Sequence, residues 1–513
     1  MAHNDASAAS AAAMPWWRRR GVLSGFLGTV LISIAVLTPG FVPNDILDRS
    51  TPLRWLRVVL DLQVGRVVMA VGLVLLFRGW VLVRPAADPT LRLGRVLTLW
   101  ALPMLVVPPV FSSDAFLYAD QGWIIHLGEH PYYSPLAEMG GPFAENVHPV
   151  WKGTTAVYPP LALLSQYVVA WATGFHAYWS VIAMRIPVLL AVAVMAWAVP
   201  RLARAHGADP RTALWVGVLN PLVVIHFIGG AHNDAGMVAL VTLAMLAATR
   251  WGKAGLVLGS VLVALGAGFK QPGLIAFIAV GLVSVAPTLG RLTLVRRFWR
   301  MFAYVGAAGV ITAATFIAMS ELTFGFGWRH ATNIGELTWG MSPASVVEQI
   351  IGPFVRLFSD YPLLPVIAKI FTVVALLTAA VFAWYFFFSD HIAPRRVPER
   401  AEHAAANDKD FTSHPIRWLV WAFNAIAFSG AGFHTWYMIW GGSMFGVLRY
   451  SDRILRWAIA ACIMFVVVQG GLEYYALRPI PGWLLGAGLG WIFLARTRHM
   501  RINPCADAAS EGS

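Results

Sequence analysis

Apolar runs of about 16 to 24 residues recur along almost the whole chain, and they constrain its fold more than any other feature. They begin near residues 22, 62, 95, 179, 211, 235, 254, 272, 300, 363, 416, 434, 455 and 481. A helix that crosses a bilayer needs about 20 consecutive apolar residues. Since 58% of the 513 residues are hydrophobic and only 12% are charged, the sequence predicts an all-α, polytopic membrane protein with about 14 transmembrane helices.

The positive charges lie mostly in short segments between the apolar runs. The formal net charge is +13, and an arginine triplet precedes the first run. Basic residues gather in the cytoplasmic loops of membrane proteins, so residues 1–21 are predicted to be a cytoplasmic tail. With that start, every later basic cluster but the one at residues 49–66 falls in the cytoplasm. This placement explains the charge without a nucleic-acid partner and predicts a multi-pass protein of the plasma membrane, embedded in the lipid bilayer.

One apolar stretch must stay out of the membrane for this topology to hold. Residues 158–175 are apolar enough to span, but a crossing there would turn the basic cluster at residues 201–211, and the clusters after it, outward. We therefore predict a long extracytoplasmic loop over residues 112–177 that contains two non-spanning helices. A second outer loop is predicted over residues 321–362.

The remaining boundaries follow from composition. Residues 22–388 form a predicted N-terminal membrane block that carries both outer loops. Residues 389–415 are polar and poor in helical patterns, so a cytoplasmic linker is predicted there. A C-terminal block of four spans, residues 416–496, and a cytoplasmic tail, residues 497–513, follow.

The first outer loop is acidic, whereas the other loops are basic: residues 112–160 contain five carboxylates and one lysine. Long loops of this kind are often functional. Ser113 is a typical N-cap for a helix that begins at Asp114. Helical spacing puts Asp114, Tyr118 and Gln121 on one face and Asp120 roughly opposite. Asp114 is a candidate catalytic residue, although a carboxylate in a first helical turn also fits a simple interaction with the helix dipole.

Aromatic and histidine residues follow in the same loop. Tyr132 and Tyr133 lie beside carboxylates, which suits carbohydrate binding, although tyrosine at a membrane interface needs no ligand. His126 and His130 have the i, i+4 spacing of metal ligands, but a glycine and a proline interrupt the helix between and after them, and no cysteine is near. No metal site is predicted.

Charged residues also occur within or at the rim of apolar runs, where they usually face a cavity or a counter-ion. Arg185 and Lys270 are two such residues, and a lipid phosphate at the outer leaflet would be a suitable partner. For Lys270 in particular, a side chain that extends to the interface is the alternative. His232, Asn233 and Asp234 follow a glycine pair at a predicted outer helix end. They either cap the next helix or bind a sugar or phosphate.

The second outer loop contains Arg329 within GFGWRHATNIGELTWG, a stretch of glycines and aromatic residues. Such a stretch suits a mobile lid over a lipid or a glycan. The chain has no GxGxxG, GxxxxGK[ST], GxSxG or HExxH pattern. This argues against nucleotide-driven pumping and against the familiar hydrolases.

Several stretches taken together resemble a known family. FSSDAFLYADQGW, HPVWKGTTAVYPPL, HFIGGAHNDAG and GAGFKQPGLIA, with an arginine in RIP, resemble the C-type glycosyltransferases. They resemble most closely the actinobacterial α-(1→6)-mannopyranosyltransferases. The resemblance covers about residues 100–290. The sequence departs from the family pattern at KQP, YPPL and HTWY, and the last difference bears on the acceptor.

The resemblance implies a C-type glycosyltransferase fold and a hexosyltransferase that takes mannose from β-mannosyl-phosphopolyprenol, the lipid polyprenyl-phosphate-mannose. The implied acceptor is the α-(1→6)-mannan of lipomannan or lipoarabinomannan, a glycolipid at the outer face of the plasma membrane. Asp114 would act as the base of an inverting transfer that needs no metal or other cofactor. The alternatives are another lipid-phosphate-sugar transferase (arabinosyl or protein O-mannosyl) and a lipid-linked-sugar flippase. Donor or substrate contacts are predicted for Tyr118, Gln121, Tyr132, Tyr158, Arg185, His232, Asn233, Asp234, Lys270 and Arg329.

Overall fold

The computed structural model describes residues 15–37, 62–289, 292–329, 341–359, 361–392, 404–429 and 432–504. Regular structure in these ranges is entirely helical, which confirms the all-α prediction for them. The α-helices up to residue 250 are α2 (Arg20–Ala35), α5 (Leu62–Leu82), α6 (Leu93–Ala101), α7 (Asp114–His126), α8 (Pro160–Ala172), α9 (Trp179–Ala183), α10 (Arg185–Ala205), α11 (Pro210–Gly217) and α12 (Asp234–Arg250). The later ones are α13 (Gly252–Ala267), α14 (Ala276–Val285), α15 (Leu294–Glu321), α16 (Pro343–Val355), α17 (Leu363–Ile392), α18 (Ala404–Ser429), α19 (Met438–Phe445), α20 (Asp452–Tyr475) and α21 (Pro479–Arg496).

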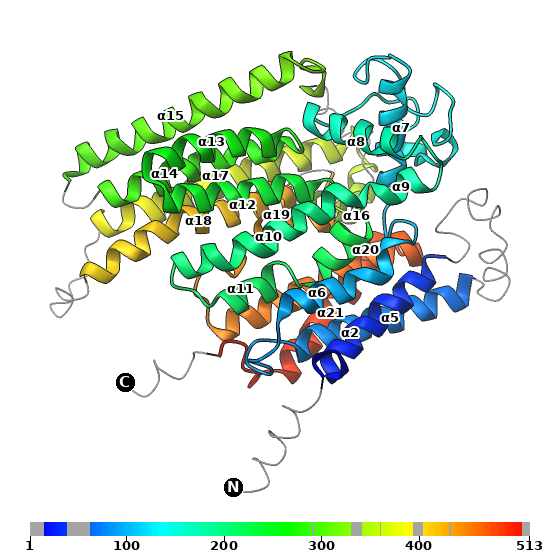
Figure 1. Cartoon of the computed structure of the whole chain (residues 1–513), viewed down its shortest axis with the longest axis horizontal. Coiled ribbons are helices and arrows are strands. Elements are labelled where there is room, and N and C mark those ends of the chain that lie inside the picture. The colour runs from blue at the N-terminus through cyan, green and yellow to red at the C-terminus, as the bar shows by residue number, and fades with distance from the viewer. Residues whose placement is uncertain are drawn as a thin grey trace, which may run out of the picture.

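Small residues bring the first two described helices into close contact. A Cβ atom added at Gly28 of α2 would lie 2.5 Å from the backbone nitrogen of Leu76 in α5, and one at Gly79 of α5 would lie 2.4 Å from the nitrogen of Gly25. Glycine at such positions lets two helix backbones approach without a hydrophobic driving force, as in membrane helix pairs. Figure 1 shows α2, α5 and α6 side by side at one edge of the bundle.

Five helical stretches among the described residues are long and apolar enough to cross a membrane. A sixth follows if the π-helix η5 (Val223–Gly229) and α12, which meet at an angle of 114°, count as one broken span. The five are Leu62–Leu82, Trp179–Ala205, Gln271–Thr288, Val295–Glu321 and Asp452–Tyr475. The number of about 14 spans is therefore not confirmed, and the side of the membrane that each loop faces stays a prediction.

Helix length explains why the described residues contain fewer candidate spans than the sequence predicts. Each of the 14 apolar runs begins in or next to a helix, but several of these helices are short. α11 and α19 have eight residues each, which corresponds to about 12 Å of rise, whereas a bilayer core is about 30 Å thick. Polar and proline residues such as Asn220 and Pro221 break the apolar runs, and composition alone does not show how far each helix continues.

The predicted first outer loop, residues 112–177, contains two α-helices, α7 and α8, joined by a segment with two short 3₁₀ helices (η3, Ala144–Asn146; η4, Pro149–Trp151). The two α-helices pack against each other and share a separate hydrophobic cluster that includes Tyr118, Phe143 and Leu163. Figure 1 shows them together at one end of the bundle. α8 has 13 residues, fewer than a span needs. The structure thus gives this region its own core.

The predicted linker is wrong in its lack of helix. α17 continues to Ile392 and α18 begins at Ala404, so both helices enter the 389–415 range, and residues 393–403 lie outside the described ranges. In the second predicted outer loop, α16 occupies Pro343–Val355, while residues 330–340 are likewise not described. The residues at 49–57 in the one exceptional basic cluster, most of the last tail and Cys505 also lie outside these ranges.

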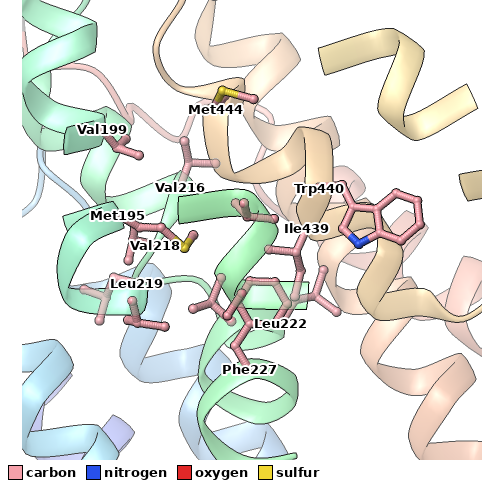
Figure 2. Packing of buried hydrophobic residues seen from close by; sticks show 14 of the residues in the cluster. Met195, Val199, Val216, Val218, Leu219, Leu222, Phe227, Ile439, Trp440 and Met444 are labelled. Atoms are coloured by element: carbon pink, nitrogen blue, oxygen red, sulfur yellow. The ribbon is translucent and has the colours of Figure 1, made fainter. Parts of the chain in front are cut away.

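One hydrophobic core joins the N-terminal and C-terminal blocks. Figure 2 shows Met195 and Val199 of α10 and Val216 of α11 packed together with Ile439 and Met444 of α19, and all five side chains are nearly or fully buried. The same cluster extends from α2 to residue 502. Segments near residues 230 and 435 are therefore held next to each other, and this contact positions the polar site described next.

Candidate active site

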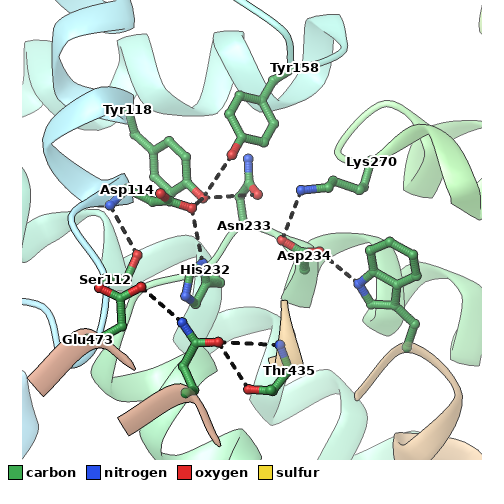
Figure 3. A network of polar contacts seen from close by, with 12 residues as sticks. Ser112, Asp114, Tyr118, Tyr158, His232, Asn233, Asp234, Lys270, Thr435 and Glu473 are labelled. Carbon is green, nitrogen blue, oxygen red and sulfur yellow. Dashed lines mark hydrogen bonds and ion pairs between the residues drawn. The ribbon is translucent and has the colours of Figure 1, made fainter. Parts of the chain in front are cut away.

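Helix α7 begins at Asp114, at the edge of a polar cluster (Figure 3). Ser113 occupies the N-cap position, but its side chain makes no capping hydrogen bond. Instead, the hydroxyl oxygen of Ser112 accepts one from the backbone N–H of Asp114 at 3.1 Å. The prediction of Ser113 as the N-cap is thus correct in position and wrong in contact. The carboxylate at the first helical position also lies in the positive end of the helix dipole.

The Asp114 carboxylate has two polar neighbours at one oxygen. Oδ2 accepts a hydrogen bond from the Tyr118 hydroxyl at 3.4 Å and lies 3.4 Å from Nδ1 of His232. The side chain of Asp114 is 19% exposed, whereas that of His232 is fully buried. Burial raises the pKa of Asp114, but the hydrogen bond and charge of His232, with smaller effects of His434 and Lys270, hold this pKa below its ordinary value. Asp114 is therefore an accessible carboxylate that stays ionised at neutral pH.

The shared face of α7 is confirmed for Asp114 and Tyr118. The Tyr118 hydroxyl shares its single proton between Oδ2 of Asp114 and Oδ1 of Asn233, which lies 3.3 Å away, and its oxygen is 3.5 Å from the hydroxyl of Tyr158. Tyr132 is buried beside them, and its hydroxyl donates to the backbone carbonyl of Tyr158 at 2.9 Å. Tyr132 therefore holds the segment that carries Tyr158 in place, and Tyr118 joins the two loops.

Asp234 and Lys270 form the second half of the cluster. Oδ1 of Asp234 accepts a hydrogen bond from the indole nitrogen of Trp440 at 2.7 Å, and Oδ2 lies 3.5 Å from Nζ of Lys270. The Lys270 ammonium lies 5.0 Å from the ring centres of both Tyr158 and Tyr437, which is within the range of a cation–π contact. Its side chain is 13% exposed and that of Asp234 is 1% exposed. Lys270 thus presents a partly accessible positive charge.

The geometry argues against the capping interpretation of the His-Asn-Asp segment, and binding of a sugar or phosphate stays a prediction. Asn233 is the N-cap of α12 by position, but no side chain caps that helix end. Its amide oxygen instead accepts from Tyr118, and His232 and Asp234 contact Asp114 and Lys270. All three side chains therefore contact other elements of the site rather than their own helix.

Arg185 is buried, and its hydrogen bonds go to backbone carbonyls rather than to the side chains of this cluster. Its side chain is 1% exposed, and its guanidinium donates to the carbonyls of Ile228 (3.0 Å), Gly229 (2.7 Å) and Pro108 (3.0 Å). Two of these bonds hold the end of η5, three residues before His232. They are the contacts of a positioning residue, and a contact of Arg185 with a lipid phosphate stays a prediction.

Gln121, Arg329 and Asp120 take no part in the contacts described above. Gln121 is fully buried, and its amide has no hydrogen-bond partner among the described residues. The guanidinium of Arg329 lies 4.5 Å from the ring centre of Phe326. Oδ2 of Asp120 accepts from the N–H of Ala137 at 2.8 Å, and burial raises the pKa of Asp120 to about 6. Asp114 and Asp120 are thus on different faces, as predicted.

A histidine and tryptophan stack from the C-terminal block also contacts the site, and the sequence patterns did not predict it. The ring of Trp436 lies 4.0 Å from that of His232 and 4.1 Å from that of His434, and both pairs are stacked. Burial lowers the pKa of His434 to about 4. His434 is therefore neutral at pH 7. The HTWY stretch, which departs from the family pattern, was the available signal.

The carboxylate of Glu473 is a second group that the sequence patterns did not place near the site. The amide oxygen of Gln469 accepts from the N–H (3.4 Å) and the hydroxyl (3.2 Å) of Thr435, and its NH₂ donates to Oε1 of Glu473 at 3.1 Å. The backbone N–H of Thr435 can only donate, so the amide orientation is fixed. Glu473 is exposed and close enough to Asp114 for their charges to interact (Figure 3). Its signal was a carboxylate within an apolar run.

The described residues contain no group of three or more His, Cys, Asp or Glu side chains arranged to hold a metal ion. The arrangement does provide an ionised carboxylate, a neutral histidine, a lysine and the neighbouring hydroxyls of Tyr118 and Tyr158. These groups suit a proton transfer next to an anionic leaving group.

Comparison with known proteins agrees with this chemistry. The model of the family described as α-(1→6)-mannopyranosyltransferase, N-terminal domain, matches residues 22–286. α-(1→6)-Mannopyranosyltransferase A of Mycobacterium tuberculosis is 32% identical over 386 residues, which cover 71% of this chain and 72% of that protein. The enzyme of the same name from Corynebacterium glutamicum is 28% identical over 459 residues, or 84% of this chain and 88% of that protein. No solved structure matches.

Proposed function

We propose a specific reaction for this chain, which belongs to the α-(1→6)-mannopyranosyltransferase family and is a hexosyltransferase. The enzyme moves mannose from β-mannosyl-phosphopolyprenol to the 6-hydroxyl of an α-(1→6)-mannan. The acceptor belongs to lipomannan or lipoarabinomannan, and the transfer takes place at the outer face of the plasma membrane. The configuration at C1 changes from β to α.

The Asp114 carboxylate carries this proposal. It is ionised and partly exposed, and it lies between a buried histidine and a tyrosine hydroxyl. In the proposed step, the acceptor oxygen O6 attacks C1 of the donor mannose while Asp114 takes the O6 proton. The bond between C1 and the phosphate oxygen breaks on the opposite side. Polyprenyl phosphate leaves with the electron pair, and the proton on Asp114 passes to water.

Lys270 is the proposed partner of the leaving phosphate. Its ammonium has one carboxylate near it, at 3.5 Å, and two tyrosine rings beside it. A phosphate that enters next to this ammonium adds a charge-assisted hydrogen bond, which strengthens as negative charge develops on the leaving oxygen. Because a phosphomonoester anion is a good leaving group, the transfer is proposed to need no metal.

The C-terminal block supplies the proposed acceptor side. Glu473 is exposed near Asp114 and is oriented by Gln469. A carboxylate accepts hydrogen bonds from sugar hydroxyls, and the neighbouring His434 and Tyr437 rings offer flat surfaces for a sugar face. We assign Glu473 to binding of the acceptor mannose and Asp114 to proton removal.

The test is a transfer assay with the purified full-length protein in detergent micelles. Labelled polyprenyl-phosphate-mannose and a synthetic α-(1→6)-dimannoside should give an α-(1→6)-trimannoside, with the same rate in the presence of EDTA. Arms with an arabinose donor and with a protein acceptor address the other transferases. Product from either of those arms alone, or a β-linked product, would contradict the proposal. Mannosyl lipid that crosses vesicle membranes without transfer would indicate the flippase instead.

A further inference from the structure

A basic pocket lies at the end of the bundle that is opposite to the active site. It is formed between the N-terminal part of α20 and the C-terminal end of α21, and it is a hollow of about 560 Å³ when the open space at its mouth is included. The lining residues are Arg453, Arg456, Trp457, Trp491, Leu494 and Arg498, with Ala495.

The packing of α20 on α21 explains why the hollow forms there. Gly482, Gly486 and Gly490 recur at every fourth residue of α21, and their nearest neighbours on α20 are Val468, Met464 and Ala460 in turn. An antiparallel pair of helices approaches closely along such a stripe. The next position in the stripe is Leu494, which is a larger residue and lines the pocket. The glycine contact therefore ends where the pocket begins.

The charges of the pocket are not neutralised within the described part of the chain. Neither Arg453 nor Arg498 has a carboxylate partner among the described residues, and Arg456 donates to the carbonyl of Met500 at 3.2 Å. The nearest acid in sequence, Asp452, is engaged elsewhere, because its Oδ1 accepts from the backbone N–H (3.0 Å) and the side-chain amide (3.2 Å) of Asn503. The pocket thus presents guanidinium groups that suit the geometry of a phosphate.

Two exposed tryptophans indicate where this pocket lies relative to the membrane. Trp457 is 53% exposed and Trp491 is 64% exposed. Arg453, Arg456 and Trp457 share one face of α20 through i, i+3 and i+4 spacing. Exposed tryptophan beside arginine at the end of an apolar helix is typical of the headgroup layer of a membrane. The lining therefore combines phosphate-binding groups with rings that pack against the upper part of a lipid.

The pocket is far from the proposed donor site. Arg453 and Glu473 are on the same helix, 20 residues apart, which corresponds to about 30 Å along its axis. This equals the thickness of a bilayer core, and α20 is one of the five candidate spans. A lipid in this pocket belongs to the other leaflet, so the pocket does not bind the mannose donor during transfer. Figure 1 shows α20 and α21 next to each other in the lower half of the view.

We propose that this pocket binds the headgroup of an anionic phospholipid in the leaflet opposite to the active site. Basic pockets between membrane helices recognise such headgroups through the phosphate and the negative charge. The bound lipid would bridge α20 and α21, and α20 also carries Glu473.

Lipid titration of the full-length protein tests this assignment. Phosphatidylglycerol is added to the delipidated protein in a neutral detergent, and bound lipid is counted by native mass spectrometry, with phosphatidylcholine and inorganic phosphate as parallel ligands. Phosphatidylglycerol should bind more tightly than phosphatidylcholine. The double variant Arg453→Gln/Arg498→Gln should weaken phosphatidylglycerol binding about 10-fold or more, since two charge-assisted contacts are lost.

A matched variant removes the same charge elsewhere. Arg250→Gln/Arg296→Gln changes two exposed arginines of α12 and α15 in predicted cytoplasmic loops and should keep the parental lipid binding. Mannosyl transfer by the Arg453/Arg498 variant should be retained, which shows that the variant is folded. Arg453→Lys/Arg498→Lys should restore part of the binding. Unchanged phosphatidylglycerol binding in the Gln variant, an equal loss in the matched variant, or full competition by inorganic phosphate would each overturn the proposal.

Discussion

Replacement of Asp114 by Asn removes the proposed base and keeps the size of the side chain. The amide oxygen still accepts from the Tyr118 hydroxyl, and the backbone N–H still donates to Ser112. The negative charge 3.4 Å from His232 is lost. That loss weakens an interaction worth on the order of 1–2 kcal/mol, so the variant should fold. Loss of the base should lower kcat at least 10²-fold, or about 2.7 kcal/mol of activation free energy.

The assay measures initial rates of mannosyl transfer at saturating donor and acceptor, together with donor affinity and the thermal midpoint. Donor affinity should remain near the parental value, because the charge change is on the acceptor side of the reacting carbon. Asp120→Asn is the matched control, since Asp120 is on the opposite face of α7 and is 1% exposed. It should lose little activity.

The refuting result is equally specific. If Asp114→Asn keeps a near-parental kcat and Asp120→Asn abolishes transfer, the base is assigned to the wrong carboxylate and α7 is oriented differently from the structure. If neither variant loses transfer, Glu473 becomes the leading candidate for the base. Asp234 is less suitable, because it is 1% exposed and already bound to Trp440 and Lys270.

Four further predictions follow from the same contacts. Lys270→Ala should weaken donor binding by about 1.5–3 kcal/mol in a titration with the donor lipid, with partial recovery in Lys270→Arg; unchanged affinity would move the phosphate site elsewhere. Glu473→Gln should raise the KM for the dimannoside and change kcat little, so a fall in kcat alone would contradict an acceptor-binding role. Because burial raises the pKa of Asp120 to about 6, the folded state binds its proton more tightly than the unfolded chain, and this group's contribution to stability falls as pH rises from about 4 to 6. Asp120→Asn should remove that slope in urea unfolding curves measured across this range, and an unchanged slope would show that another group titrates. Finally, Tyr133→Cys, at a side chain that is 70% exposed, should react with an impermeant thiol reagent from outside intact cells in a background without the two native cysteines; labelling only after lysis would reverse the predicted orientation.

Local periodicity explains what could be predicted from the sequence. The i, i+4 relation of Asp114 and Tyr118 is fixed once α7 forms, and a glycine pair before His232 marks a chain reversal. Both inferences require only contacts between neighbours in sequence. The His-Asn-Asp segment and Lys270 were likewise recognisable, because charged groups at the ends of apolar helices are energetically costly without a partner.

The hydrogen-bond partners of a buried charged side chain were harder to predict. A buried guanidinium needs acceptors, and a lipid phosphate or three backbone carbonyls satisfy it equally well in a sequence pattern. The structure provides Arg185 with carbonyls of Pro108, Ile228 and Gly229. The number of spans was uncertain for a related reason. An apolar run predicts a buried helix, but α11 ends after eight residues at Gly217, shortly before Asn220. Hydrophobic composition alone does not reveal where the helix ends.

The residues of the C-terminal block carried signals in the sequence, but their contacts with the site could not be predicted because these contacts join positions more than 200 residues apart. Trp440 reaches Asp234, and Trp436 stacks on His232, only because α19 packs against α10, α11 and α12. This division has a functional consequence. The part of the chain that matches the family model, residues 22–286, contains Asp114 and Lys270, which would perform the displacement. The proposed acceptor side, with Glu473 and the HTWY stretch, lies beyond it. We therefore expect the displacement chemistry to be common to the family and the choice of acceptor to depend on residues after about 430.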